Sequence, residues 1–181
     1  MIGVSQKSAW YFLHKIRYML EHRESNNRLR ATVEVDDAYV CRRKEKGKCG
    51  RGFENKTPVF RVVQRNERVS ITPVENAKRE TLGPIIYKRI KVGSHIMNDE
   101  WWAYTKLGKR LYCSKTQEER ICAGNIYTNT IEGARSHLER LVMGTYHRPS
   151  KEHLSKYCAE FEFTYNTRNN TQTSKFNQSV D

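Results

Sequence analysis

The sequence lacks the long apolar run of a membrane-spanning helix, which requires roughly 18 consecutive apolar residues. The N-terminus also lacks a signal-peptide pattern, because basic side chains interrupt its apolar residues. These side chains are Lys7, His14, Lys15 and Arg17. No internal repeat is present, which argues against a repeat architecture. We therefore expect an intracellular chain without a membrane partner, located in the cytoplasm or nucleoid, or in the nucleus of a eukaryotic source.

Cysteines are few and are not spaced as metal ligands or redox pairs. No C-x-x-C pair occurs, and the odd number of five argues against a disulfide framework. The five residues are Cys41, Cys49, Cys113, Cys122 and Cys158. Reduced thiols are expected in an intracellular protein. A zinc site built on Cys41 and Cys49 is the weaker alternative.

Acidic residues are in short supply, since 20 Asp and Glu face 33 Lys and Arg, for a net charge of +13. This balance predicts a polyanionic partner, most often nucleic acid, although an unspecific basic surface is the alternative. Residues 42–52 concentrate the charge in a glycine-containing loop. This loop is either a solvated hairpin tip or, as we favour, a DNA-phosphate contact. Its basic residues are Arg42, Arg43, Lys44, Lys46, Lys48 and Arg51.

Ten Tyr, six Phe and three Trp argue against disorder, and 181 residues suffice for one medium domain with a core. Hydrophobic periodicity predicts an α/β layer architecture, in which a strand meander and a fourth strand after a crossover helix form a mixed sheet covered by helices. The predicted strands are 31–40, 57–65, 68–74 and 95–98. The predicted helices are 5–22 with Ser5 as N-cap, 76–90 with Pro84 as a kink or as its start, one beginning near Trp101, 129–143 ended by Gly144, and 150–165 capped by Ser150. The polar C-terminal tail is expected to be poorly ordered.

Three acids stand where such a sheet could bring them together. Asp36 lies in the first strand, Asp99 follows the fourth, and Glu132 begins a helix. Converging carboxylates can hold Mg²⁺ ions that act on a phosphodiester. Each acid also has an ordinary alternative. Asp36 could face solvent or pair with a nearby Arg, Asp99 could cap the next helix, and Glu132 could complete a capping box with Asn129. Spacing alone leaves these alternatives open.

Five segments resemble, in order and approximate spacing, bacterial insertion-sequence transposases allied to the eukaryotic Merlin elements. The similarity runs from about Gly3 to Arg168, and NTIEG is its most specific part. The segments are VSQKSAWYFLHKIR, VEVDDAYV, NDEWWAY, YTNTIEGARSHLERLVMGTYH and HLSKYCAEFEFTYNTR. The resemblance implies an RNase H-like catalytic domain of the DDE type, with Asp36, Asp99 and Glu132 as catalytic and metal-binding acids. Asn129 is a minor candidate for the third position.

The resemblance also implies a reaction and its partners. A domain of this kind uses Mg²⁺ (or Mn²⁺) to cleave DNA at transposon ends and to join the 3′-hydroxyl to target DNA. A homodimer or larger assembly on DNA is implied. Arg135, Arg140 and His147 are further candidate DNA contacts. The implied division is a helical remnant of a helix-turn-helix module (1–28), the catalytic domain (29–168) and a polar tail (169–181).

Several positions depart from the family pattern. Tyr127 stands where His is usual, and Glu139 replaces a Lys, so that a cation able to contact DNA phosphate becomes an anion. These departures suggest a diverged or truncated copy. Two alternatives to an active transposase follow. One is a catalytically decayed or domesticated DNA-binding protein, and the other is a nuclease of similar fold that cuts DNA without joining it.

Overall fold

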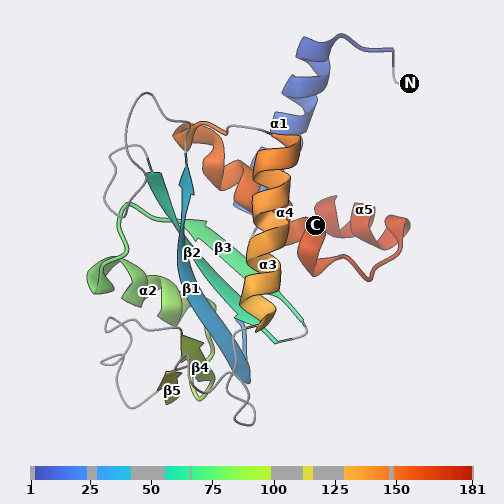
Figure 1. Cartoon of the computed structure of the whole chain (residues 1–181). Coiled ribbons are helices and arrows are strands. Elements are labelled where there is room, and N and C mark those ends of the chain that lie inside the picture. Colours follow the sequence, from blue (N-terminus) through green and yellow to red (C-terminus); the bar gives the residue numbers. More distant parts are fainter. Residues whose placement is uncertain are drawn as a thin grey trace.

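The computed structural model describes residues 3–23, 28–41, 56–65, 67–98, 112–115, 129–146 and 149–180. A five-stranded mixed sheet of order β3-β2-β1-β4-β5 forms their centre (Figure 1). The first three strands are antiparallel, whereas β4 is parallel to β1 and β5 is parallel to β4. The strands are β1 (Thr32–Cys41), β2 (Lys56–Gln64), β3 (Val69–Pro73), β4 (His95–Asn98) and β5 (Tyr112–Lys115). The predicted α/β class and mixed sheet are confirmed.

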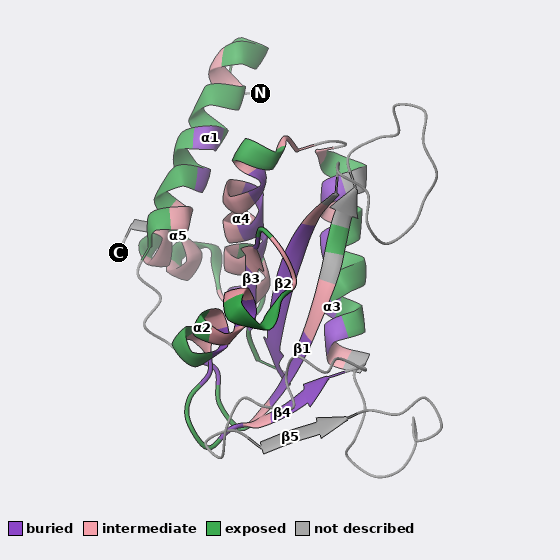
Figure 2. Cartoon of the chain, turned by 90° about the vertical axis from the view of Figure 1, so that its left-hand side faces the viewer, coloured by how far each residue is buried: buried purple, intermediate pink, exposed green. Residues whose placement is uncertain are grey.

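Helices cover both faces of this sheet. Helix α2 lies on one face, while α3 and α4 lie on the other, with α1 packed against α4 (Figures 1 and 2). No helix among the described residues is long and apolar enough to cross a membrane. The helices are α1 (Gln6–His22), α2 (Arg79–Arg89), α3 (Asn129–Arg140) continued by a π-helical turn (Leu141–Thr145), a 3₁₀ turn (Lys151–His153) leading into α4 (Leu154–Asn166), and α5 (Gln172–Val180).

The period-2 alternation of strand residues divides the core into two layers. On one face of the sheet, Val33 and Val35 of β1 pack with Leu82 and Ile86 of α2. On the other face, the core combines residues of β2 and β3 with one side each of α3 and α4. These residues are Val59, Val63, Val69, Ile71, Ile131, Ala134, Leu138, Val142, Leu154, Cys158 and Phe161. Burying each large aliphatic side chain contributes about 1.5–3 kcal/mol, so both layers stabilise the sheet.

The four predicted strands are present, and the first helix begins as expected. The Ser8 amide donates to Oγ of Ser5 at 3.2 Å, which confirms the N-cap. The apolar residues of α1 do not face the core, however. Trp10 and Ile16 are about half exposed, whereas His14 and Arg17 are the buried residues of this helix. The packing of α1 is therefore polar, because Arg17 donates to Glu160 of α4 at 2.8 Å.

Other expectations require correction. The tail is not without structure, because residues 172–180 form α5. Gly144 does not end the helix predicted at 129–143, which continues as a π-helical turn through Thr145. Ser150 occupies the N-cap position without a side-chain hydrogen bond, and Pro84 lies inside α2 and not at its start. Strand β5 was missed because its four residues carry no alternating pattern. The helix expected near Trp101 lies outside the described residues.

The outer edge of β3 is covered by side chains of α4. Asn166 accepts from the Val69 amide at 2.8 Å and donates to the Val69 carbonyl at 2.9 Å. Glu162, one turn earlier, accepts from the Ile71 amide at 3.1 Å. The next outward position of the strand is Pro73, which has no N–H to satisfy. The strand edge is thereby closed to pairing with another chain.

Candidate active site

Strand β1 directs two carboxylates toward α3. Val33 and Val35 point into the α2 layer, so the alternation of the strand places Glu34 and Asp36 on the opposite face. In the antiparallel register, Asp36 lies opposite Arg61 of β2. The central strand therefore presents acids to a face where α3 contributes apolar side chains.

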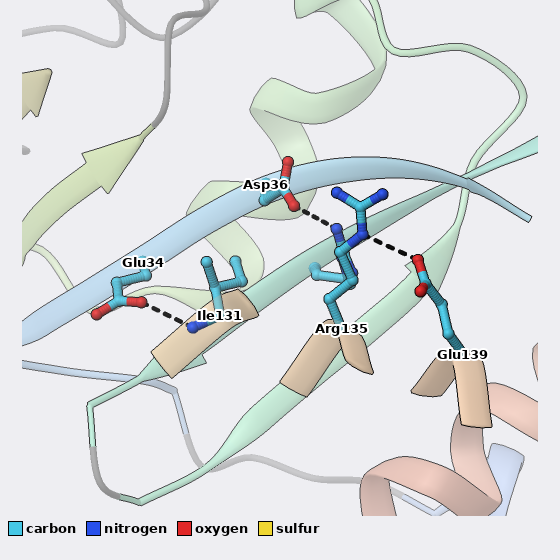
Figure 3. Close-up of polar contacts among 6 residues, drawn as sticks. Glu34, Asp36, Ile131, Arg135 and Glu139 are labelled. Carbon is cyan, nitrogen blue, oxygen red and sulfur yellow. Dashed lines mark hydrogen bonds and ion pairs between the residues drawn. The ribbon is translucent and has the colours of Figure 1, made fainter. Parts of the chain in front are cut away.

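Glu34 anchors the first turn of α3. Its side chain is fully buried, and its Oε2 accepts from the Ile131 amide at 2.8 Å (Figure 3). Its Oε1 accepts from Nε of Arg65 at 2.7 Å. A carboxylate at a helix start satisfies an amide that has no partner within the helix and favours the positive end of the helix dipole. Glu34 thus fixes the helix turn that carries Glu132.

Sequence analysis missed Glu34. It predicted a helix that starts at Asn129, which is confirmed, and it offered a capping box between Asn129 and Glu132 as one alternative for the first turn. The available signal was a glutamate between two buried valines, Val33 and Val35, in a strand expected to lie at the centre of the sheet. Such a glutamate is buried only with a partner. The identity of that partner depends on a contact across 97 residues.

Asp36 forms an ion pair with Arg61, whose side chain is buried. Burial raises the pKa of Asp36 above its ordinary value, and Asp37 raises it further, while Arg61 and Arg135 act in the opposite direction. Arg61 contacts Oδ2 of Asp36. The side chain of Asp36 is 27% exposed, so the carboxylate remains open to an incoming group.

The outward side of α3 carries alternating charges. Glu132, Arg135 and Glu139 are all exposed. Nε of Arg135 donates to Glu139 at 2.9 Å (Figure 3). This hydrogen bond is the main cause that raises the pKa of Arg135, and the charges of Asp36 and Glu132 add to it. Arg135 therefore lies within electrostatic reach of both candidate acids.

The described residues place only part of the predicted site. Asp36 lies on β1 and faces α3, and Glu132 lies on α3 itself. Arg140 is exposed on the same helix, where its Nε donates to the Ser136 carbonyl at 3.2 Å. Within this part of the chain, no group of three or more His, Cys, Asp or Glu could hold a metal ion. The predicted residues that lie outside the described ranges are Asp99, Arg42, Arg43, Lys44, Lys46, Lys48, Arg51 and His147.

One cysteine can be assigned. Cys158 is a free thiol buried in the core between the sheet and α4, and burial raises its pKa to about 12. A thiol in this environment stays protonated at neutral pH and is unreactive. Cys158 therefore acts as a core residue, in agreement with the expectation of reduced thiols.

The family profile of the ISXO2-like transposase domain matches residues 28–166, which include every strand, α3 and α4. The chain belongs to this family. Helix α1 and α5 lie outside the matched part of the transposase domain. Among curated proteins, none matches the sequence.

One similar solved structure is the simian T-cell lymphotropic virus intasome in complex with the PP2A regulatory subunit B56 gamma. The transposase domain is 13% identical to a chain of that complex, with a TM-score of 0.44. The match covers 90% of this chain and 61% of the other. A likeness this distant does not bear on the activity of the transposase domain.

Proposed function

We propose that this chain is the catalytic domain of an insertion-sequence DDE transposase, which cleaves DNA and joins the resulting 3′-hydroxyl to a target strand. The observation that carries the proposal is the placement of Asp36 on the central strand, two residues beyond the carboxylate that anchors the helix turn bearing Glu132. Both lie within the matched transposase region. Asp99 directly follows β4, which is parallel to β1 and next to it, so it is the third proposed acid.

The sheet supports an RNase H-like fold for this domain. Three antiparallel strands lead into two parallel ones, and the first strand is central, with helices on both faces. Ligands of open α/β sheets collect near the carboxyl ends of parallel strands. Asp99 stands directly after such an end. Alliance with the Merlin elements and a diverged state, suggested by Tyr127 and Glu139, form part of the same proposal.

The donor set fits a hard divalent cation. Asp36 and Glu132 supply carboxylate oxygens, which Mg²⁺ and Mn²⁺ prefer. Asp36 is partly exposed, and among the described residues no hydrogen bond reaches its Oδ1. Asp36, Asp99 and Glu132 would hold the metal, which when bound activates the attacking oxygen and stabilises the leaving oxygen of a phosphodiester.

The protein's own residues have distinct proposed roles. Arg61 supplies a buried counter-charge that opposes the effect of burial on the pKa of Asp36. Glu34 positions the first turn of α3 through the Ile131 amide. Arg135 and Arg140 are exposed on α3 and would contact DNA phosphates. The partners are transposon-end and target DNA, with a homodimer or larger assembly implied by analogy.

A strand-transfer assay with Mg²⁺ or Mn²⁺ tests the proposal. We expect Asp36→Asn and Asp99→Asn to abolish joined product while DNA binding persists. Asp37→Asn is the matched control, because strand alternation turns this neighbour toward the opposite face of the sheet. The control should keep its activity.

Other outcomes assign other functions. Cleavage without joining would indicate a nuclease. Salt-sensitive DNA binding without any cleavage, unchanged by Asp36→Asn, would indicate a decayed DNA-binding protein. One observation favours a decayed DNA-binding protein: Arg135, a candidate DNA contact, forms an ion pair with Glu139. Retention of full joining by Asp36→Asn would refute the catalytic assignment.

A further inference from the structure

A groove of about 610 Å³ lies between the end of α1, strand β3 and helix α4, with residues near α5 closing one side. Its volume falls within the roughly 300–1,000 Å³ typical of ligand sites. Of its described lining residues, none belongs to β1 or α3, so it is separate from the candidate active site. Helix α4 supplies most of the residues at its floor, including Glu162, Phe163 and Asn166.

Three arginines from separate parts of the chain line this groove. Arg23 follows α1, Arg68 precedes β3, and Arg89 ends α2. Among the described residues, no carboxylate lies within ion-pair distance of any of them. Ion pairs elsewhere in the described part of the chain include those of Arg17, Arg61, Arg65 and Arg135. The groove thus gathers three guanidinium groups that form no ion pair with the described carboxylates, although the charge of Arg89 acts on the nearby Glu162.

The two acids among the described lining residues do not cancel this charge. Oε2 of Glu162 accepts from the Ile71 amide at 3.1 Å, and burial raises the pKa of this carboxyl, while the Ile71 amide and the charge of Arg89 act in the opposite direction. Glu21 is the other acid. Three cations against these two acids leave a positive excess among the described lining residues.

The chemistry of the lining favours phosphodiesters. Arginine binds phosphate through paired N–H donors, and an exposed guanidinium loses less hydration than an ammonium on binding. The guanidinium of Arg23 lies 5.8 Å from the ring centroid of Phe163, which places an aromatic ring beside a cation in the groove. Cations combined with aromatic rings are typical of nucleic-acid channels.

We propose that this groove is a second DNA-binding surface, in which Arg23, Arg68 and Arg89 contact phosphates of a DNA segment other than the one at the candidate active site. The inference rests on the proposed function for the identity of the polyanion. It does not depend on catalysis, because the groove contains none of the candidate acids.

Salt-dependent binding of duplex DNA, measured in EDTA, tests this surface. The Arg23→Gln/Arg68→Gln/Arg89→Gln variant should bind more weakly and reduce the slope of log K against log salt by about 2–3, since each lost phosphate contact removes about 0.9. The matched control removes three exposed cations elsewhere, with Lys7→Gln, Lys78→Gln and Lys151→Gln. Equal losses in both variants would overturn the proposal.

Arginine modification by phenylglyoxal tests the unmodified protein, without reliance on variants that fold poorly. DNA should protect Arg23, Arg68 and Arg89, while the exposed Arg79 of α2 stays reactive. A mononucleotide at the same phosphate concentration should protect them far less. Protection by the mononucleotide and not by DNA would instead identify a small-molecule site and reject the proposal.

The two proposals can fail separately. If the triple arginine variant binds DNA as the unsubstituted chain does and still joins strands, the groove proposal fails and the transposase proposal stands. If DNA protects the groove arginines but no joining occurs with Mg²⁺ or Mn²⁺, the groove stands and the catalytic proposal fails.

Discussion

At the residue scale, Glu34 is the charge on which the candidate site depends. It is fully buried, and it joins β1 both to Arg65 and to the first turn of α3. Replacing one partner of a buried ion pair leaves the other without a counter-charge, which costs more than the pair itself contributes. Replacing Glu34 should therefore cost more stability than replacing any exposed acid on α3.

Glu34→Gln should lower the free energy of unfolding by about 3 kcal/mol, because the substitution removes the carboxylate charge from a buried ion pair. Urea denaturation measures this loss. Glu80→Gln, at an exposed position of α2, is the matched control and should change stability by less than about 0.5 kcal/mol. A loss below about 1 kcal/mol for Glu34→Gln would show that the buried pair is not needed.

Glu139 has the opposite character, since its ion pair with Arg135 is exposed and contributes little to stability. Glu139→Lys should tighten DNA binding, because it frees Arg135 and adds a cation beside it. The salt slope should steepen by about 1–2. Glu139→Gln should produce a smaller gain. Glu152→Gln, exposed on the 3₁₀ turn, is the control in an anisotropy titration, and an equal gain there would assign the effect to net charge alone.

At the element scale, side chains of α4 form the hydrogen bonds that a neighbouring strand would form along the outer edge of β3. Asn166 and Glu162 stand one turn apart and meet successive outward amides of the strand. The i, i+4 spacing of a helix therefore matches the two-residue repeat of a strand edge. This arrangement protects the edge from pairing with another chain.

Asn166→Ala should cost about 1–2 kcal/mol, because it leaves both the N–H and the C=O of the buried Val69 without partners. It should also promote self-association through the uncovered edge, detectable by sedimentation. Asn166→Asp keeps the acceptor but loses the donor, so its stability should lie between those of the unsubstituted chain and Asn166→Ala. Thr164→Ala, exposed on the same helix, is the control; if it destabilises as much, the edge contact is not the cause.

At the scale of the whole molecule, α1 is attached to the transposase domain by a polar contact. The guanidinium of Arg17 lies beside the rings of Tyr146 and Tyr157, 4.9 and 4.6 Å from their centroids. Next to it, His14 lies 3.3 Å from the Tyr157 hydroxyl. Burial lowers the pKa of His14, and the charges of Arg17, His153 and Lys156 lower it further, with Glu160 opposing them. The attachment therefore depends on pH.

Because folded His14 binds a proton more weakly than the unfolded chain does, its contribution is unfavourable to folding once the pH falls below about 6.5, and it is absent above that value. We expect thermal stability to fall between pH 7.5 and 5.5, and to fall less in His14→Gln. His137→Gln, exposed on α3, should follow the unsubstituted chain. If His14→Gln loses as much thermal stability at low pH as the unsubstituted chain does, His14 is not a cause of the pH dependence.

Local patterns were enough to predict most elements. Ser5 and the periodicity behind it marked α1, and alternating valines marked β1, because propensity and capping act within a few residues. The local pattern of α1 nevertheless does not show which face is buried, because the buried residues are His14 and Arg17. The partner on α4 is a set of Tyr and Glu side chains that accept a cation, which no pattern within α1 can indicate.

By itself, the sequence determined the α/β class, the order of the predicted elements, the family resemblance and the candidate acids Asp36 and Glu132. Tertiary structure alone decided which charges are neutralised. Glu34 and Arg61 are buried in pairs, whereas the groove arginines Arg23, Arg68 and Arg89 have no ion-pair partner among the described residues. The physical reason is range. Periodicity is set by neighbours along the chain, but the free energy of a charge depends on burial and on partners that folding brings from distant segments.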